Sequence, residues 1–116
     1  MGKIVGFHPV ELRPGADAAE LERLVRDDLA PIYQQLRQTV YLMKGDRGAY
    51  AGKYTVVIEI ESAQERDRIY HVVDGELELS EDALRIFEQS EEIGEKLGAL
   101  VVSFPSPEFT DYEVLD

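Results

Sequence analysis

The chain has 116 residues, of which 44% are hydrophobic and 31% charged, a composition typical of one folded domain and not of a disordered chain. Its 24 acidic and 12 basic residues give a formal charge of −12 at pH 7, which disfavours binding to nucleic acids and to anionic membrane surfaces. The absence of cysteine excludes disulfides, a thiolate nucleophile and cysteine-ligated zinc. With neither a membrane-length apolar run nor a signal-peptide pattern, the sequence predicts a cytoplasmic single domain over residues 1–116.

The chain begins with a predicted strand and a predicted helix. Residues 3–12 are rich in β-favouring apolar side chains and end at the turn Pro14-Gly15, which indicates a first strand. Asp17, with Glu20 three residues later, has the spacing of a capping box at a helix start. The apolar face of this helix is formed by Leu21, Leu24, Val25, Leu29, Ile32 and Leu36.

A proline and a hairpin follow within the first half. Pro31 lies inside the helical pattern, so we expect a kink or a one-turn break near Ala30. The next two predicted strands are Thr39–Lys44 and residues 54–61. The turn sequence of residues 45–48 lies between them, which predicts an antiparallel hairpin.

The second half is predicted to be largely helical. Ser62 with Glu65 forms a second capping-box pattern, which opens a short helix to about Tyr70. Ser80 opens a longer helix that Gly98 ends. The buried stripe of this longer helix is formed by Ala83, Ile86, Phe87, Ser90, Ile93 and Leu97.

The order of these elements predicts the fold class. Residues 99–104 fit either a last helical turn or a strand, and residues 112–115 are predicted to form a final edge strand. The pattern is the split βαβ order of a ferredoxin-like α+β fold, a four-stranded antiparallel sheet with helices on one face. The first and third strands carry apolar residues on both sides. Both faces of the sheet should therefore be covered, and a sheet-to-sheet homodimer would cover the second.

Short motifs along the chain support a family resemblance. They are His8-Pro9-Val10, Leu12-Arg13-Pro14-Gly15, Pro31 within a helix, Gly45-Asp46-Arg47-Gly48, Gly52-Lys53-Tyr54, Glu61-Ser62, Arg66-Asp67-Arg68 and Thr110-Asp111-Tyr112. In this order, over nearly the whole chain, they resemble the dimeric α/β-barrel superfamily, and within it the uncharacterised small bacterial-type proteins. In that superfamily two ferredoxin-like subunits pack their sheets around a central cavity. Its members include cofactor-free oxygenases, polyketide cyclases, dehalogenation and haem-handling enzymes and stress-associated proteins, so the resemblance implies a cavity and no particular chemistry.

Three residues are candidates for catalysis in such a barrel. His8 is expected in mid-strand on the barrel face, where a neutral imidazole can act as general base. Because the first and third strands should be neighbours, we expect Glu59 on the same face, orienting the ring. Tyr41 is expected to donate a hydrogen bond to an oxyanion. The alternative is a structural histidine bonded to backbone or water, and tyrosines that serve only in packing.

Three further residues are candidates for ligand binding. Asp46 and Arg47 in the hairpin turn would form an anion clamp at the cavity mouth, or serve turn geometry alone. Tyr54 is a third candidate, through its phenol group. Neither a metal nor a cofactor is expected, because the acidic residues lack metal-loop spacing and the glycines of residues 45–52 precede a strand.

The leading functional hypothesis is a small-molecule enzyme of the cofactor-free oxygenase or cyclase type that binds a hydrophobic or aromatic substrate. The alternative is a non-catalytic ligand-binding or stress-associated dimer. A pocket with convergent polar groups favours the enzyme. A barrel filled by Val57, Ile4 and Met43 favours the alternative.

Overall fold

The computed structural model describes residues 2–104, 106 and 108–115. The strands are β1 (Ile4–Val10), β2 (Thr39–Lys44), β3 (Tyr54–Ile60), β4 (Tyr70–Val73), β5 (Glu76–Leu79) and β6 (Thr110–Glu113). The helical segments are α1 (Ala18–Arg23), the π-helical turn η1 (Leu24–Leu29), α2 (Ala30–Gln34), α3 (Ala63–Ile69), α4 (Glu81–Gln89) and α5 (Glu91–Leu100). Within these described ranges, no helix is long and apolar enough to cross a membrane.

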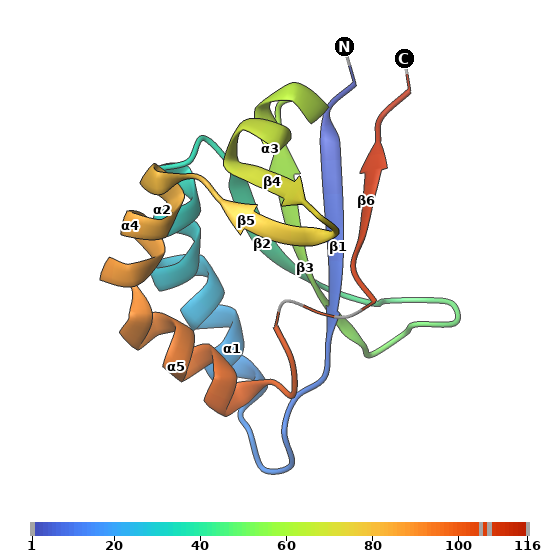
Figure 1. The fold of residues 1–116 in the computed structure, drawn as a ribbon. Coiled ribbons are helices and arrows are strands. Elements are labelled where there is room, and N and C mark those ends of the chain that lie inside the picture. The colour runs from blue at the N-terminus through green and yellow to red at the C-terminus, as the bar shows by residue number, and fades with distance from the viewer. Residues whose placement is uncertain (1, 105, 107, 116) are drawn as a thin grey trace.

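The main sheet has four antiparallel strands in the order β2-β3-β1-β6, and the helices lie on one side of it (Figure 1). A separate two-stranded sheet is formed by β4 and β5. The predicted α+β class, the four-stranded antiparallel sheet and the pairing of the first strand with the third are confirmed. This arrangement is compatible with a ferredoxin-like fold.

The first helical region changes its winding just before Pro31. The Asp17 side chain caps α1 by accepting a hydrogen bond from the N–H of Ala19 at 3.0 Å, one residue earlier than a capping box with Glu20 requires. The six residues of η1 form a wider π-helical turn that ends as α2 begins. A proline ring crowds the preceding turn and offers no N–H, and a π-turn accommodates such a disturbance. The interruption predicted near Ala30 is therefore confirmed, as a widened turn.

The segment between α3 and α4 contains a hairpin that the sequence analysis does not predict. Ser62 and Ser80 cap the two helices as expected, since each hydroxyl accepts a hydrogen bond from the N–H three residues later, at 3.1 Å and 3.2 Å. Between them, β4 and β5 are joined by Asp74-Gly75, whose φ angles of 52° and 80° are those of a tight hairpin turn. The Asp-Gly pair was the sequence signal for this hairpin.

The C-terminal third differs from the prediction in its boundaries. The single long helix is instead α4 and α5, which break at Ser90, where φ is −111° and ψ is 18°. Of the ambiguous residues 99–104, the first two complete α5, and Val101 then forms an isolated bridge with Leu12. The last strand is β6 and not residues 112–115, because pairing with β1, and not apolarity, sets its position.

The two sides of the main sheet differ in what covers them. On the helix side, Ile4 and Val10 of β1 pack with Val56 and Ile58 of β3 in the main hydrophobic core. The other side has no helix on it in Figure 1, and we call it the open face. By register it consists of Val5, Phe7, Pro9, Thr39, Tyr41, Met43, Thr55, Val57, Glu59, Thr110 and Tyr112.

Candidate functional site

The open face carries large apolar side chains that are in contact with solvent. Met43 and Tyr112 are 40% and 55% exposed, and the Phe7 ring packs edge-on against Tyr112 with 5.4 Å between centroids. Val57 is only 1% exposed, since Phe7 and Tyr41 flank it on the neighbouring strands. Val57 belongs to neither core cluster on the helix side, so the open face has a small apolar cluster of its own.

A hydrogen-bonded polar group lies within this apolar surface. The Tyr41 hydroxyl donates to Glu59 Oε2 at 2.5 Å, and Lys3 Nζ donates to Glu59 Oε1 at 2.9 Å. The hydrogen bond from Tyr41, and then that from Lys3, holds the pKa of the Glu59 carboxyl below its usual value. The same Tyr41–Glu59 bond raises the pKa of the phenol. At neutral pH the group therefore contains a carboxylate and a neutral phenol.

His8 does not belong to this group, and the expected His8–Glu59 pair is wrong. His8 is opposite Val56 in the β1–β3 ladder, whereas Glu59 is opposite Val5, so the two side chains lie on opposite sides of the sheet. The imidazole is 9% exposed on the helix side and not on the open face. The Phe109 ring stacks on it, with 5.3 Å between centroids and 8° between the rings, and the Phe104 ring lies tilted at 5.6 Å.

Burial disfavours the protonated form of the His8 imidazole. It lowers the pKa of His8, with the negative charge of Asp111 opposing that effect. Nδ1 is buried and has no hydrogen-bond partner among the described residues. His8 is therefore neither bonded to backbone nor oriented by a carboxylate through this atom.

Asp111 is the carboxylate whose charge acts on the pKa of His8. The absence of a side chain at Gly6 leaves space for both residues. A Cβ added at Gly6 would lie 2.7 Å from Asp111 Oδ1 and 3.4 Å from His8 Nε2, so the two side chains converge over this glycine. The other carboxylate oxygen of Asp111 accepts a weak hydrogen bond from Arg66 Nη1 at 3.4 Å. His8, Asp111 and Arg66 thus form a second polar group, separated from the open face by the sheet itself.

Two predicted residues meet at a hollow beside the edge strand β2. Tyr41 and Tyr54 both line it, although their side chains lie on opposite sides of the sheet by register. The hollow has a volume of about 440 Å³, and its walls include the buried Val25 of η1 and Val40 of β2. Lys44 Nζ lies 5.7 Å from the centroid of the Tyr54 ring, at cation–π distance. This hollow has the size of a small-ligand site.

Asp46 and Arg47 lie apart from every group described above. Both are exposed in the loop of residues 45–53. Neither lines the hollow beside β2. The loop closes through backbone hydrogen bonds of 2.8 Å from Gly45 N–H to Lys53 O and from Gly52 N–H to Gly45 O. These bonds support the turn geometry, and the anion clamp stays a prediction.

Sequence reasoning missed two of the groups that the structure brings together. The sequence pattern indicates Lys3 only as the start of a strand, and its ion pair with Glu59 spans 56 positions of sequence. Asp111 stood in the Thr110-Asp111-Tyr112 motif, but the predicted strand began after it. Its side chain was therefore not assigned to a face, although strand alternation would have placed it with His8 once β6 was paired with β1.

The chain was compared with protein-family models, with curated proteins and with solved structures, and no match was found in any of the three.

Proposed function

We propose that the protein works as a homodimer through the open face and that the paired sheets hold a small hydrophobic or aromatic molecule, as the dimeric α/β-barrel resemblance implies. The observation that carries this proposal is the open face itself, an apolar surface with an ionised carboxylate among its side chains. Exposed apolar residues that form a contiguous patch are typical of an interface or a ligand site. Phe7 and Tyr112 pack together on this face, Met43 is exposed on its edge strand β2, and a second copy offers the same apolar residues in return.

The Lys3–Glu59–Tyr41 group supports a proton-transfer step of the oxygenase or cyclase type. The Glu59 carboxylate takes a proton from an activated C–H beside a substrate carbonyl, and the electron pair of that bond moves onto the carbonyl oxygen. Tyr41 donates its hydrogen bond to this oxyanion. When the phenol turns from Glu59 to the substrate, the main cause of the lowered Glu59 pKa is removed, so Glu59 becomes a stronger base. Loss of this proton precedes either ring closure or reaction of the carbanion with dioxygen.

A second candidate, a non-catalytic ligand-binding or stress-associated dimer, is supported by a different observation. Val57, at 1% exposure, fills the centre of the open face. In a dimer two copies of this side chain would narrow the space between the sheets. In addition, a carboxylate with a lowered pKa is a weak base while Tyr41 and Lys3 remain bound to it.

Native mass spectrometry on gently purified protein tests the assembly. The wild-type chain is expected as a dimer, and Met43→Asp as a monomer because it puts a charge into the open face. Leu84→Asp is the matched control, since Leu84 has a similar exposure of 45% but lies on α4. A wild-type monomer, or a Met43→Asp variant that dimerises as well as Leu84→Asp, contradicts the proposed interface.

The same spectra test the ligand and the chemistry. A reproducible extra mass on the dimer identifies the bound compound, and that compound is then incubated in D₂O with the protein. The enzyme is expected to exchange the acidic C–H for deuterium, Glu59→Gln to lose the exchange, and Glu113→Gln to keep it, since Glu113 pairs with Ile4 on the helix side. A bound compound without Glu59-dependent exchange favours the non-catalytic candidate.

A further inference from the structure

A larger hollow lies on the helix side, at the meeting point of the end of α2, α3 and α4. Its volume is about 580 Å³, within the range of small-molecule sites. The floor is apolar: Leu36 and Ile69 are 3% and 1% exposed and belong to the second core cluster, and Ile86 packs against it. This hollow lies away from the open face, so an inference about it stands independently of the proposed function.

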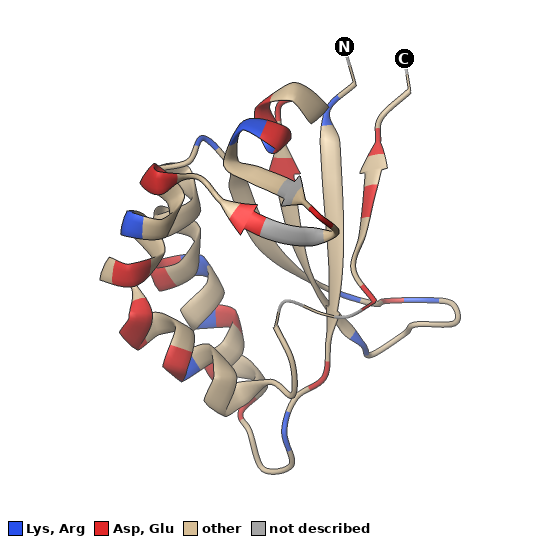
Figure 2. Ribbon diagram, in the orientation of Figure 1, with Lys and Arg blue, Asp and Glu red and all other residues tan. Residues whose placement is uncertain are grey.

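The walls of this hollow are basic, in contrast to the rest of the chain. Arg37, Arg68 and Arg85 line it, together with Asp82. Arg85 Nη2 donates to Asp82 at 2.6 Å, and Arg68 donates to Glu65 from Nε at 3.1 Å and from Nη2 at 2.5 Å. The hollow therefore gathers three guanidinium groups against two carboxylates, in a chain with 24 acidic and 12 basic residues. Acidic residues lie along α4 and α5 in Figure 2, so the guanidinium groups mark this hollow as a locally basic place in the helical layer.

Of the three arginines that line this hollow, Arg37 is the one without an ion pair among the described residues, and it holds an unfavourable backbone conformation. Its φ angle is 61°, in the left-handed region where glycine or asparagine is usual. The N–H of Arg37 donates to Gln34 O at 3.0 Å, and that of Gln38 to Tyr33 O at 3.0 Å, the pattern of a Schellman helix end. The other non-glycine residue with a positive φ among those described, Asp74, is explained by its hairpin turn. The backbone conformation at position 37 favours glycine or asparagine over arginine. We therefore look to the arginine side chain for a role at this position.

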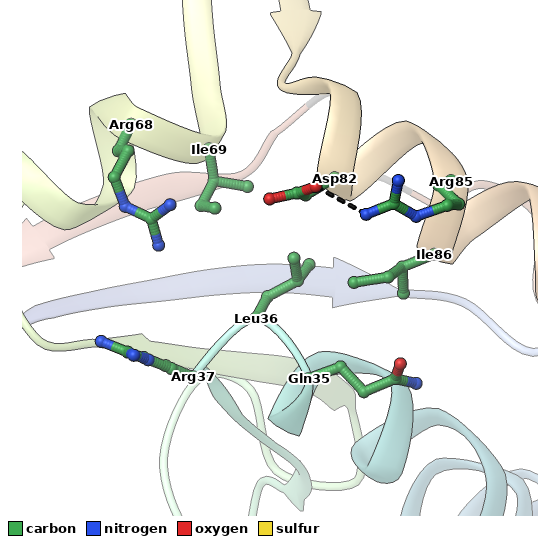
Figure 3. A pocket seen from close by; sticks show the side chains of 8 residues that line it. All are labelled: Gln35, Leu36, Arg37, Arg68, Ile69, Asp82, Arg85 and Ile86. Carbon is green, nitrogen blue, oxygen red and sulfur yellow. Dashed lines mark hydrogen bonds and ion pairs between the residues drawn. The ribbon is translucent and has the colours of Figure 1, made fainter.

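The basic and apolar groups of the hollow are arranged side by side. In Figure 3 the guanidinium groups of Arg37 and Arg68 lie on one side, the Asp82–Arg85 pair and Ile86 lie on the other, and Leu36 and Ile69 lie between them. Arg37 and Arg68 both act on the Glu65 carboxyl. The hydrogen bond from Arg68 is the main cause of its lowered pKa, and the charge of Arg37 lowers that pKa further. A planar guanidinium fork fits the two oxygens of a carboxylate or phosphate.

We propose that this hollow binds a small molecule that carries an oxyanion, a carboxylate or a phosphate, on an apolar body. The oxyanion is held by Arg37 and Arg68, and the apolar part covers Leu36 and Ile86. Because both arginines are exposed, the attraction is screened by salt, and affinity falls as ionic strength rises from about 0.02 M to about 0.2 M.

Titration of the isotope-labelled full chain, followed by backbone amide NMR shifts, tests this proposal with four probes. Octanoate and octyl phosphate carry an oxyanion on an apolar chain, octanol has the chain alone, and inorganic phosphate has the charge alone. We expect saturable shifts within residues 35–37, 68–69 and 82–86 with at least one of the first two, and weaker binding of the last two. Octanoate without octyl phosphate identifies a carboxylate site, and the reverse identifies a phosphate site. Equal binding of octanol or of inorganic phosphate, or shifts confined to the main sheet, overturns the proposal.

Arg37→Gly separates binding from folding. Glycine suits the left-handed conformation, so the thermal unfolding midpoint is expected to be unchanged or higher. Loss of the charge-assisted hydrogen bonds is expected to weaken probe binding about tenfold. Arg23→Gln is the control for net charge, because Arg23 lies on α1 with its side chain 63% exposed, paired only loosely with Glu20 at 3.8 Å. An Arg37→Gly variant that binds as tightly as Arg23→Gln rules out the proposed site.

Discussion

The two sides of the main sheet present the same strands to different surroundings. On the helix side His8 packs against two phenylalanine rings and its pKa is lowered, first of all by burial. On the open face Glu59 is partly exposed and its pKa is lowered by hydrogen bonds from Tyr41 and Lys3. Both pKa values are lowered, but the causes differ between the two faces. Burial disfavours protonation of His8. The pKa of Glu59 is lowered by hydrogen bonds from Tyr41 and Lys3, which a ligand can replace.

The largest expected difference between the faces is in packing. Ile58→Ala removes a side chain that is 7% exposed in the main core and should lower the free energy of unfolding by about 3 kcal/mol. Met43→Ala, on the open face at 40% exposure, should cost less than about 0.5 kcal/mol in the monomer. Urea unfolding at low protein concentration measures both, and equal losses would contradict the contrast between the faces. A cost for Met43→Ala that grows with protein concentration would add support for the dimer.

A smaller effect is expected where His8 and Asp111 converge. Gly6→Ala places a Cβ 2.7 Å from Asp111 Oδ1, so the carboxylate must move and weaken its bond with Arg66. We expect a loss of no more than about 1 kcal/mol in thermal or urea unfolding, because the atom that must move is the end of a flexible side chain.

Gly94→Ala is the control for this glycine. Nothing lies within 4 Å of a Cβ at Gly94, which is inside α5, so alanine there should stabilise the protein by about 0.4–1 kcal/mol. Two substitutions with the same sign of effect would contradict a tight approach at Gly6.

The pH dependence of stability should separate the faces next. The pKa of His8 in the folded protein lies below the ordinary histidine value of 6.5, so between the two pKa values the unfolded chain binds more protons. The contribution of His8 is therefore complete above pH 6.5 and is lost as pH falls through that window, with a slope of at most about 1.4 kcal/mol per pH unit. Glu59 also has a lowered pKa, and its contribution is lost only as pH falls below 4.5.

Urea unfolding across this pH range measures both windows. His8→Phe should remove the upper one, and Glu59→Gln should weaken the lower one. An upper window that persists in His8→Phe would show that another group causes it.

The smallest expected effect is on the open-face hydrogen bonds. Tyr41→Phe should change the free energy of unfolding by no more than about 0.5 kcal/mol, because exposed polar pairs contribute little. In Glu59→Gln the pKa of the Tyr41 phenol should fall back towards 10.0, since its hydrogen bond to Glu59 is the main cause of the shift. Carbon NMR of the phenol ring follows this titration, and an unmoved Tyr41 pKa would contradict the observed pairing.

Much of the fold could be predicted from local signals. The first three strands of the main sheet, the serine caps of α3 and α4 and the disturbance before Pro31 depend on neighbouring residues alone. The β4–β5 hairpin had its own local signal in Asp74-Gly75, which was overlooked. The position of β6 had none, because its exposed residues are ordered by pairing with β1 and not by burial.

The candidate site was predicted in part. Tyr41 and Glu59 were selected, and the structure joins them directly. His8 was assigned to the wrong side, because its strand carries apolar residues on both faces and no local feature says which face the helices cover. Lys3 is placed by a contact with Glu59 that is distant in sequence, and Arg37 is marked by its positive φ angle. Periodicity in the sequence reveals neither feature.

Sequence alone sets which residues alternate together along each strand, where α1, α3 and α4 begin, and that the first and third strands are apolar on both sides. These properties follow from the two-residue repeat of a strand and from local hydrogen bonding at helix ends. Only the tertiary structure decided that His8 shares a face with Asp111, that Glu59 meets Tyr41 and Lys3, and that three arginines surround one hollow. The two-residue repeat of a strand separates its side chains into two sets, but it does not show which set faces the helices. Packing of the helices against one side of the sheet determines that.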